Sequence, residues 1–310
     1  MSGPVFITGH RGLLGSALLR ASEGRKVITA TRAELDLCDG DAVAEFIHDQ
    51  KPAAIIHAAA RNGGVALHEA EPAMMLADNL AIALNVIRAA ADARVPRLLY
   101  VSSATVYAGE GSEPLAESRA GAVMPTGPTA GYALAKLAGM ALCDAVRRQH
   151  GLTFHSIIPC NLYGPGDNYH PQHSTVAPAL LRRMHDAIAT NATAFPLWGS
   201  GRQRREFLHA EDVAAACLHL LALSEPPARA NCGPGGSTSI MELAREIQAV
   251  TQFSGTIVPD LTKPDGPPRP ALDCTLLHHL GWSPRISLAS GLRSTYEAFL
   301  KDSREGILRG

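Results

Sequence analysis

The sequence predicts an α/β protein: a doubly wound parallel sheet with helices on both faces, joined to a smaller, discontinuous α/β domain. Two observations lead to this prediction. Over residues 5–160, short apolar runs that fit buried strands alternate with helical patterns, an order typical of parallel sheets. In addition, the first strand, residues 5–8, leads directly into a turn with three glycines and then into a helix. This order predicts a ligand site at the carboxyl ends of the strands.

The glycine turn that follows the first strand has the features of a pyrophosphate cradle. Glycine allows a tight turn and leaves no Cβ between the main chain and a phosphate, and the free amides at the start of the next helix face the anion. An ordinary loop is the alternative, because glycine triads also occur by chance. The G-x-x-G-x-x-G spacing resembles that of the short-chain dehydrogenase/reductases, which have a Rossmann sheet. The cradle residues predicted to bind a dinucleotide are Gly9, Arg11, Gly12, Leu13, Leu14 and Gly15.

The end of the second predicted strand, residues 26–30, indicates which dinucleotide binds. An NAD site usually places a carboxylate near this point, whereas an arginine suits the 2′-phosphate of NADP. Arg32 stands there, and Arg11 could supply a second positive charge. The sequence therefore predicts NADP(H). The alternative is two solvated arginines, with Glu34 and Asp36 close enough to form ordinary ion pairs.

The next elements continue the alternation. A helix is expected from Asp41 to Gln50, a buried strand from Ala53 to His57 and a long helix from Met74 to Ala93. Small residues that include Ala59 follow the strand, where a cofactor could lie close to the backbone. Asp39, just before the first of these helices, is a candidate partner for the adenine amino group.

A serine, a tyrosine and a lysine form the predicted catalytic group. Ser103 follows a strand at residues 97–101, and Tyr132 and Lys136 lie one turn apart on a later helix. A free phenol has a pKa of about 10, and a neighbouring ammonium favours the phenolate, so we expect Lys136 to lower the pKa of Tyr132 and also to contact the cofactor. Ser103 would bind the reacting oxygen. The alternative is a surface helix pair.

Bulk properties fit a cytoplasmic enzyme. The chain has 310 residues and a net charge of -1, with Lys+Arg 28 against Asp+Glu 29, which gives no sign of a nucleic-acid or anionic-membrane partner. No apolar run reaches the roughly 20 residues that cross a bilayer, and no signal-peptide pattern precedes the first strand. The six cysteines show no metal-ligand spacing, so we expect buried free thiols and no metal.

Four longer motifs resemble the GDP-L-fucose synthase family of extended short-chain dehydrogenase/reductases. The resemblance covers nearly the whole chain. It implies an NADPH-dependent, homodimeric enzyme that epimerises carbons 3 and 5 of a nucleotide-linked 4-keto-6-deoxyhexose and then reduces the 4-keto group. The motifs are residues 9–16, 158–168, 197–201 with 205–209, and 262–269.

The resemblance also implies a site for the nucleotide diphosphate-sugar. Its expected members are Asn161, Arg183, Trp198, Arg205 and Lys263. Arginine forks and a lysine charge suit a diphosphate, and an indole can stack on a base or sugar. The alternatives are a turn-capping asparagine, a solvated helical arginine and a core tryptophan.

Two departures from the family change the expected reaction. Thr105 and Thr175 stand where the family has its epimerase cysteine and histidine. An alkyl hydroxyl does not readily take a proton from carbon, whereas a thiolate or an imidazole does. We therefore expect epimerisation to be lost and reduction to survive, with both threonines facing the substrate. His170 or His173 could replace the base if the loop has shifted, although exposed loop histidines are the simpler interpretation.

The chain should divide into two discontinuous domains. Residues 1–160 and about 202–232 form the predicted NADP-binding domain, and about 161–201 with 233–310 form the predicted nucleotide-sugar domain. The proline-rich stretch from Lys263 to Pro270 is expected to be a rigid loop that faces the phosphates.

The sequence therefore predicts an NADPH-dependent 4-ketoreductase of a GDP- or dTDP-linked 4-keto-6-deoxy sugar. The alternatives are the complete epimerase–reductase, a nucleotide-sugar 4-epimerase and a cofactor-sensing protein on an inactive scaffold. The 4-epimerase is considered because residues 102–107 also resemble that branch.

Overall fold

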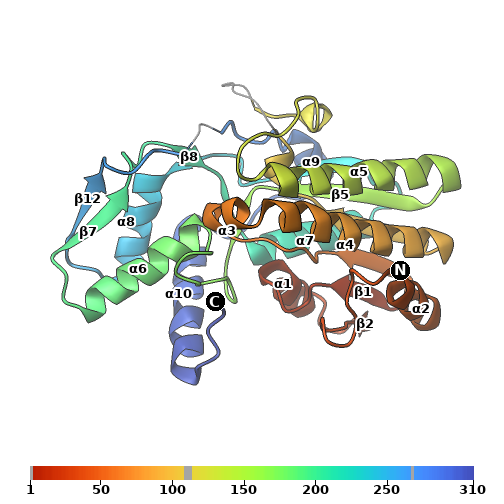
Figure 1. Cartoon of the computed structure of the whole chain (residues 1–310), viewed down its shortest axis with the longest axis horizontal. Coiled ribbons are helices and arrows are strands. Elements are labelled where there is room, and N and C mark those ends of the chain that lie inside the picture. Colours follow the sequence, from red (N-terminus) through yellow and green to blue (C-terminus); the bar gives the residue numbers. More distant parts are fainter. Residues whose placement is uncertain (1–2, 108–113, 267–268) are drawn as a thin grey trace.

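The computed structural model describes residues 3–107, 114–266 and 269–310. A six-stranded sheet with the order β10-β5-β4-β3-β1-β2 lies at its centre, and every pair of neighbours is parallel (Figure 1). The predicted doubly wound sheet is confirmed. The second strand is shorter than expected. The strands are β1 (Val5–Thr8), β2 (Val27–Ile28), β3 (Ala54–His57), β4 (Arg97–Val101), β5 (Thr153–Pro159) and β10 (Arg229–Cys232).

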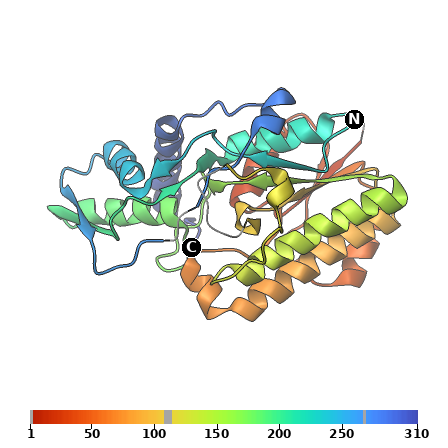
Figure 2. The same ribbon diagram turned by 90° about the horizontal axis from the view of Figure 1, so that it is seen from above.

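Helices cover both faces of this sheet. Helices α4 and α5 lie side by side on one face next to α2, and α1 packs with α7 on the other (Figure 2). Strands that are buried on both faces need apolar residues at consecutive positions, and β1 and β3 are buried along their whole length. The helices are α1 (Leu13–Ala21), α2 (Gly40–Gln50), α3 (Val65–Ala70), α4 (Pro72–Asp92), α5 (Ala130–His150) and α7 (Ala210–Ala222).

A smaller part of the chain, at the left in Figure 1, has a hydrophobic cluster of its own. It consists mainly of the β7–β12 pair with helices α6, α8 and α10. Leu272, Cys274, Leu277 and Trp282, from the stretch expected to belong to the substrate domain, pack instead in the larger cluster beneath the sheet. The domain limits themselves stay a prediction. The elements are α6 (Val176–Ala189), β7 (Ala194–Trp198), α8 (Ile240–Thr251), β12 (Thr256–Asp260) and α10 (Leu288–Glu305).

Short elements join the two parts. Strand β6 pairs with β9, and β8 pairs with β11. The proline-rich loop predicted at 263–270 includes residues 267 and 268, which lie outside the described part of the chain. The remaining short elements are η1 (Ala104–Val106), η2 (Glu117–Arg119), β6 (Asn161–Tyr163), β8 (Arg204–Arg205), β9 (Phe207–His209), β11 (Thr238–Ser239) and α9 (Thr275–His279).

Helix α4 differs from the expectation that no segment could span a bilayer. By length and composition its 21 residues are sufficient, with a mean hydropathy of 1.3. A core helix of a soluble protein has the same properties, and α4 packs against α2, α3 and α5 and buries Met75, Ala83, Val86 and Ile87. All six cysteines are free thiols, and five of them are buried. In the described ranges, no cluster of three or more His, Cys, Asp or Glu side chains could hold a metal ion.

A fully buried asparagine, Asn231, connects the end of β10 to the segments around the site. Its Nδ2 donates to the carbonyls of Leu115 (2.7 Å) and Asp273 (2.9 Å). Its Oδ1 accepts from the hydroxyl of Tyr107 at 2.6 Å, and its main-chain amide donates to Oε1 of Glu117 at 2.9 Å. Because buried polar groups must be paired, this side chain holds three separate segments in a fixed arrangement.

Replacing Asn231 by Ala should lower the free energy of unfolding in urea by about 3 kcal/mol. It removes the hydrogen-bond partners of the Asp273 carbonyl and of the Tyr107 hydroxyl, and it takes one of two donors from the Leu115 carbonyl. Asn85→Ala is the matched control. Asn85 donates one bond, to the carbonyl of Leu37, so its loss should cost about 1 kcal/mol. Equal costs for the two variants would contradict this role of Asn231.

Candidate active site

The glycine turn has the close packing that a dinucleotide cradle requires. Gly9 has a φ of +69°, and a Cβ there would lie 2.8 Å from the Cα of Ala59. A Cβ on Gly15 would lie 2.0 Å from the carbonyl oxygen of Gly9. The amide of Ala59 donates to the hydroxyl of Thr8 at 3.1 Å, which joins the turn to the end of β3. Only glycine fits at these two positions, and no side chain caps the first amides of α1, so the turn fits a pyrophosphate.

The predicted adenosine-side residues lie at the surface beside this turn. Arg32 is exposed and pairs with Asp36 at 3.7 Å, as the alternative interpretation proposed. Hydrogen bonds from Thr31, with the charge of Arg11, lower the pKa of Glu34. A role of either arginine at the 2′-phosphate stays a prediction.

Asp39 has a structural role that the sequence analysis did not assign. It caps α2 by accepting from the amides of Asp41 and Ala42, each at 3.1 Å. Aspartate is a preferred residue at this helix position. Its contact with adenine stays a prediction.

The structure brings the predicted lysine and tyrosine together at the end of β4. Lys136 is buried on α5, and its ammonium donates to the carbonyl of Val101 at 2.8 Å. The same Nζ lies 5.6 Å from the ring centroid of Tyr132, which is 6% exposed. Ser103 follows β4, and its hydroxyl accepts from the amide of Thr105 at 3.3 Å. The interpretation of Tyr132 and Lys136 as a surface pair is therefore wrong.

The pKa of Tyr132 does not show the expected lowering by Lys136, because the effect of burial is larger. Burial raises the pKa of Tyr132 above its ordinary value and lowers that of Lys136 to about 7. Both side chains are buried, and desolvation disfavours the charged form of each. At neutral pH the phenol therefore keeps its proton, which suits a group that must donate one to a ketone.

A histidine that the sequence analysis missed lies against the tyrosine. The ring of His68 on α3 meets the ring of Tyr132 edge-on, with centroids 5.6 Å apart. His68 is buried, its Nε2 is 3.0 Å from Oδ1 of Asn62, and burial lowers its pKa. No motif or spacing marked this residue, because the contact depends on how α3 packs against α5.

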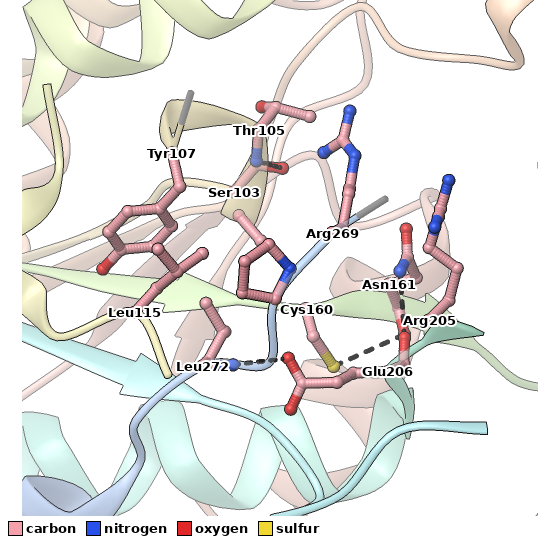
Figure 3. A pocket seen from close by; sticks show the side chains of 12 residues that line it. Ser103, Thr105, Tyr107, Leu115, Cys160, Asn161, Arg205, Glu206, Arg269 and Leu272 are labelled. Carbon is pink, nitrogen blue, oxygen red and sulfur yellow. Dashed lines mark hydrogen bonds between the residues drawn. The ribbon is translucent and has the colours of Figure 1, made fainter. Parts of the chain in front are cut away.

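A pocket opens next to Ser103 (Figure 3). It contains the predicted residues Thr105, Asn161 and Arg205, and it adds Glu206 and Arg269, which the sequence analysis did not single out. Burial lowers the pKa of both arginines, and the charge of Arg269 lowers that of Arg205 further. Two neighbouring guanidinium groups favour an anion. The lining residues are Ser103, Ala104, Thr105, Tyr107, Leu115, Cys160, Asn161, Arg205, Glu206, Arg269, Pro270 and Leu272.

The other predicted substrate residues form a second group on the smaller part. The guanidinium carbon of Arg183 lies 4.9 Å from the ring centroid of Trp198, and Nζ of Lys263 lies 5.8 Å from it. Arg183 donates to the carbonyl of Pro196 at 2.6 Å. Trp198 is 57% exposed, so its interpretation as a core residue is wrong. An exposed indole beside two cations can contact an anionic ligand that carries a ring.

Neither predicted replacement base reaches the pocket beside Ser103. The imidazoles of His170 and His173 stack on each other with centroids 4.2 Å apart. Their loop docks on α3, where the amide of Gly64 donates to the carbonyl of His173 at 2.6 Å. Thr175 is exposed at the start of α6. The pocket's described lining residues include none of these three side chains.

Chemically, the site can deliver a proton from a buried phenol, next to an anion pocket and a turn shaped for a dinucleotide. This combination is typical of an oxidoreductase of the short-chain dehydrogenase/reductase class. Residues 5–233 match the model of the NAD dependent epimerase/dehydratase family. The chain belongs to this family.

Similar proteins narrow the assignment. The chain is 43% identical to the GDP-L-fucose synthase of Escherichia coli (strain K12), over 96% of this chain and 97% of that protein. It is 32% identical to the GDP-L-colitose synthase of Yersinia pseudotuberculosis, with 96% and 98% covered. A GDP-mannoheptose C4 reductase of Campylobacter jejuni with NADP bound has a TM-score of 0.84 and 28% identity, with 96% and 98% covered. The resemblance to the GDP-L-fucose synthase family is confirmed, and with it the assignment as an oxidoreductase.

Tyr132→Phe removes the proposed proton donor and keeps the packed ring. We expect kcat for NADPH oxidation to fall at least 100-fold, while NADPH binding, followed by fluorescence titration, stays intact. The control is Tyr169→Phe, because Tyr169 is also buried and its hydroxyl has no hydrogen-bond partner. A Tyr132→Phe enzyme with wild-type kcat would exclude the phenol as donor.

The titration of Lys136 should appear in the pH profile. With a pKa of about 7, its ammonium is present below this pH and lost above it, and the ammonium stabilises the phenolate that remains after proton transfer. Therefore kcat/KM should fall as the pH rises through about 7. Lys136→Arg keeps its charge over this range, so any activity it retains should not show this fall. The same fall in both enzymes would assign the titration to another group.

Proposed function

We propose that this protein is an NADPH-dependent 4-ketoreductase of a nucleotide-linked 4-keto-6-deoxy sugar that does not epimerise carbons 3 and 5. The observation that carries the proposal is a contrast between two groups of residues. Tyr132 and Lys136 are packed together beside the end of β4, which Ser103 follows, whereas Thr105 and Thr175 replace the epimerase pair of the family.

The cofactor is NADP(H), which the glycine turn would hold from Gly9 to Gly15 on the amides at the start of α1. When bound, it supplies the hydride that reduces the ketone. Lys136 would bind it from the side of α5. The residues of this chain hold the substrate and deliver the proton.

The proton moves from Tyr132 to the carbonyl oxygen of the substrate. The raised pKa of the phenol keeps this proton available at neutral pH. Ser103 would donate a hydrogen bond to the same oxygen and fix its position. Lys136 opposes the negative charge that develops on the phenol, and in a dry site this interaction is stronger than in water.

Epimerisation needs a base in place of the family's cysteine, and Thr105 does not supply one. The hydroxyl of Thr105 is buried in the pocket wall without a hydrogen-bond partner, so no group there activates it. An unactivated alkyl hydroxyl does not take a proton from carbon at neutral pH. The reduction needs neither threonine, and this supports a reductase that acts alone.

The pocket cations suit the diphosphate of the substrate. Arg205 and Arg269 would hold it beside Asn161, and Trp198 with Arg183 would contact the nucleotide end. Relatives named for GDP-linked sugars support a GDP-linked substrate, and a dTDP-linked one remains the alternative. We place the reaction in the cytoplasm.

The test is incubation of the purified enzyme with GDP- and dTDP-linked 4-keto-6-deoxy sugars and NADPH. One NADPH should be oxidised per product, and NMR should show the substrate's own configuration at carbons 3 and 5. Inverted centres would establish the complete epimerase–reductase. Interconversion of the corresponding 4-hydroxy sugars without net oxidation of NADPH, with oxidised cofactor tightly bound, would establish a 4-epimerase.

The missing bases can be restored. Thr105→Cys combined with Thr175→His should give the enzyme measurable exchange of solvent deuterium at carbons 3 and 5, because a thiol and an imidazole have suitable pKa values. Mass spectrometry of the product measures this exchange. The control is Thr105→Ser with Thr175→Asn, which should give none. Deuterium at these positions with the control would show that another base is present.

We also propose a homodimer formed through α4 and α5. An apolar groove between these helices is lined by Leu80, Ala83, Leu84, Ala138, Gly139 and Leu142, and Leu84 is 49% exposed. Two equal helix pairs can cover each other across a twofold axis. Sedimentation should give twice the mass of the 310-residue chain, and Leu84→Arg should give the monomer. A wild-type monomer would exclude the dimer.

A further inference from the structure

Glu206 joins three walls of the pocket beside Ser103 (Figure 3). Its main-chain carbonyl accepts from Nδ2 of Asn161 at 2.9 Å, on the wall that follows β5. Its Oε2 accepts from the amide of Leu272 at 2.8 Å, on the wall that carries Arg269. The third wall carries Arg205, which precedes Glu206 in the chain. The side chain is 6% exposed, so water does not compete for these bonds.

The Leu272 wall is a single extended segment that is held from both sides. On one side Leu115 pairs with it, donating to the carbonyl of Ala271 at 2.8 Å and accepting from the amide of Asp273 at 3.0 Å. On the other side the carboxylate of Glu206 accepts from the amide of Leu272, which lies between Ala271 and Asp273. The bond spans 66 positions in the chain, so it links two segments that the sequence alone leaves independent.

We infer that Glu206 is a positioning residue that sets the spacing between Arg205 and Arg269, and through it the affinity for the diphosphate of the substrate. The inference rests on the proposed function, because it needs a diphosphate in this pocket. Arg269 lies three residues before the amide that Glu206 holds. If this amide is released, Arg269 can move away from Arg205, since like charges repel.

The second oxygen of the carboxylate explains which replacement should work. Oε1 has no hydrogen-bond partner, and a Cβ on Gly233 would lie 2.8 Å from it. Burial raises the pKa of Glu206 to about 7, so the neutral form is populated under physiological conditions. The neutral amide of glutamine should therefore accept from Leu272 in the same place, whereas leucine offers no acceptor and aspartate is too short to reach.

The experiment measures KM and kcat for the sugar substrate, together with calorimetric Kd for GDP, for E206Q, E206D and E206L. E206L should raise KM and Kd at least tenfold and change kcat little, and E206D should do so to a smaller extent. E206Q should restore most of the affinity. The control is Asp212→Leu, which removes similar buried bonds, from the amides of Arg285 at 3.1 Å and Ile286 at 2.9 Å, outside the pocket.

A double-mutant cycle tests the route of the effect. If Glu206 acts through Arg269, E206L should add less than a twofold loss of GDP affinity to R269A. Full additivity would overturn the inference, as would wild-type affinity in E206D and E206L. If E206L does not fold, E206D and E206Q with R269A give the same comparison. Failure of R205A and R269A to weaken GDP binding would instead overturn the proposed diphosphate site.

Discussion

The hydrogen bond from Lys136 to the carbonyl of Val101 is the contact on which the site depends. It ties the first turns of α5 to the end of β4, and it places Tyr132, one turn earlier, over the same edge of the sheet. An ammonium is costly to bury without a partner. The sheet provides this partner, a main-chain carbonyl at the end of a strand, so Lys136 can stay buried at 3% exposure.

The burial of Tyr132 and Lys136 determines which proton transfers the site favours. The phenol of Tyr132 keeps its proton, and the ammonium of Lys136 loses part of its preference for the charged form. Such a pair is well suited to donate one proton and poorly suited to abstract one from carbon. The neighbouring pocket adds positive charge through Arg205 and Arg269, and its carboxylate, Glu206, is buried and holds the amide of Leu272. The geometry therefore supports reduction of a bound anionic substrate.

The sequence alone predicted the parts of this structure that depend on local pattern. The sheet, the glycine turn and the spacing of Tyr132 and Lys136 follow from apolar periodicity and helical geometry. The pKa of Tyr132 could not be predicted, since it depends on burial by the whole fold. His68 and Glu206 were missed for the same reason: each acts through a contact with a residue more than 60 positions away.

The central claim is that this site delivers one hydride and one proton to a single carbonyl group, the hydride to its carbon and the proton to its oxygen. It is tested most directly by running the wild-type reaction to completion in deuterated water and locating the label in the product by mass spectrometry and NMR. The account predicts no deuterium on carbons 3 and 5. Exchange there needs a base, and Thr105 and Thr175 stand where the family has its cysteine and histidine. Deuterium on either carbon would contradict it.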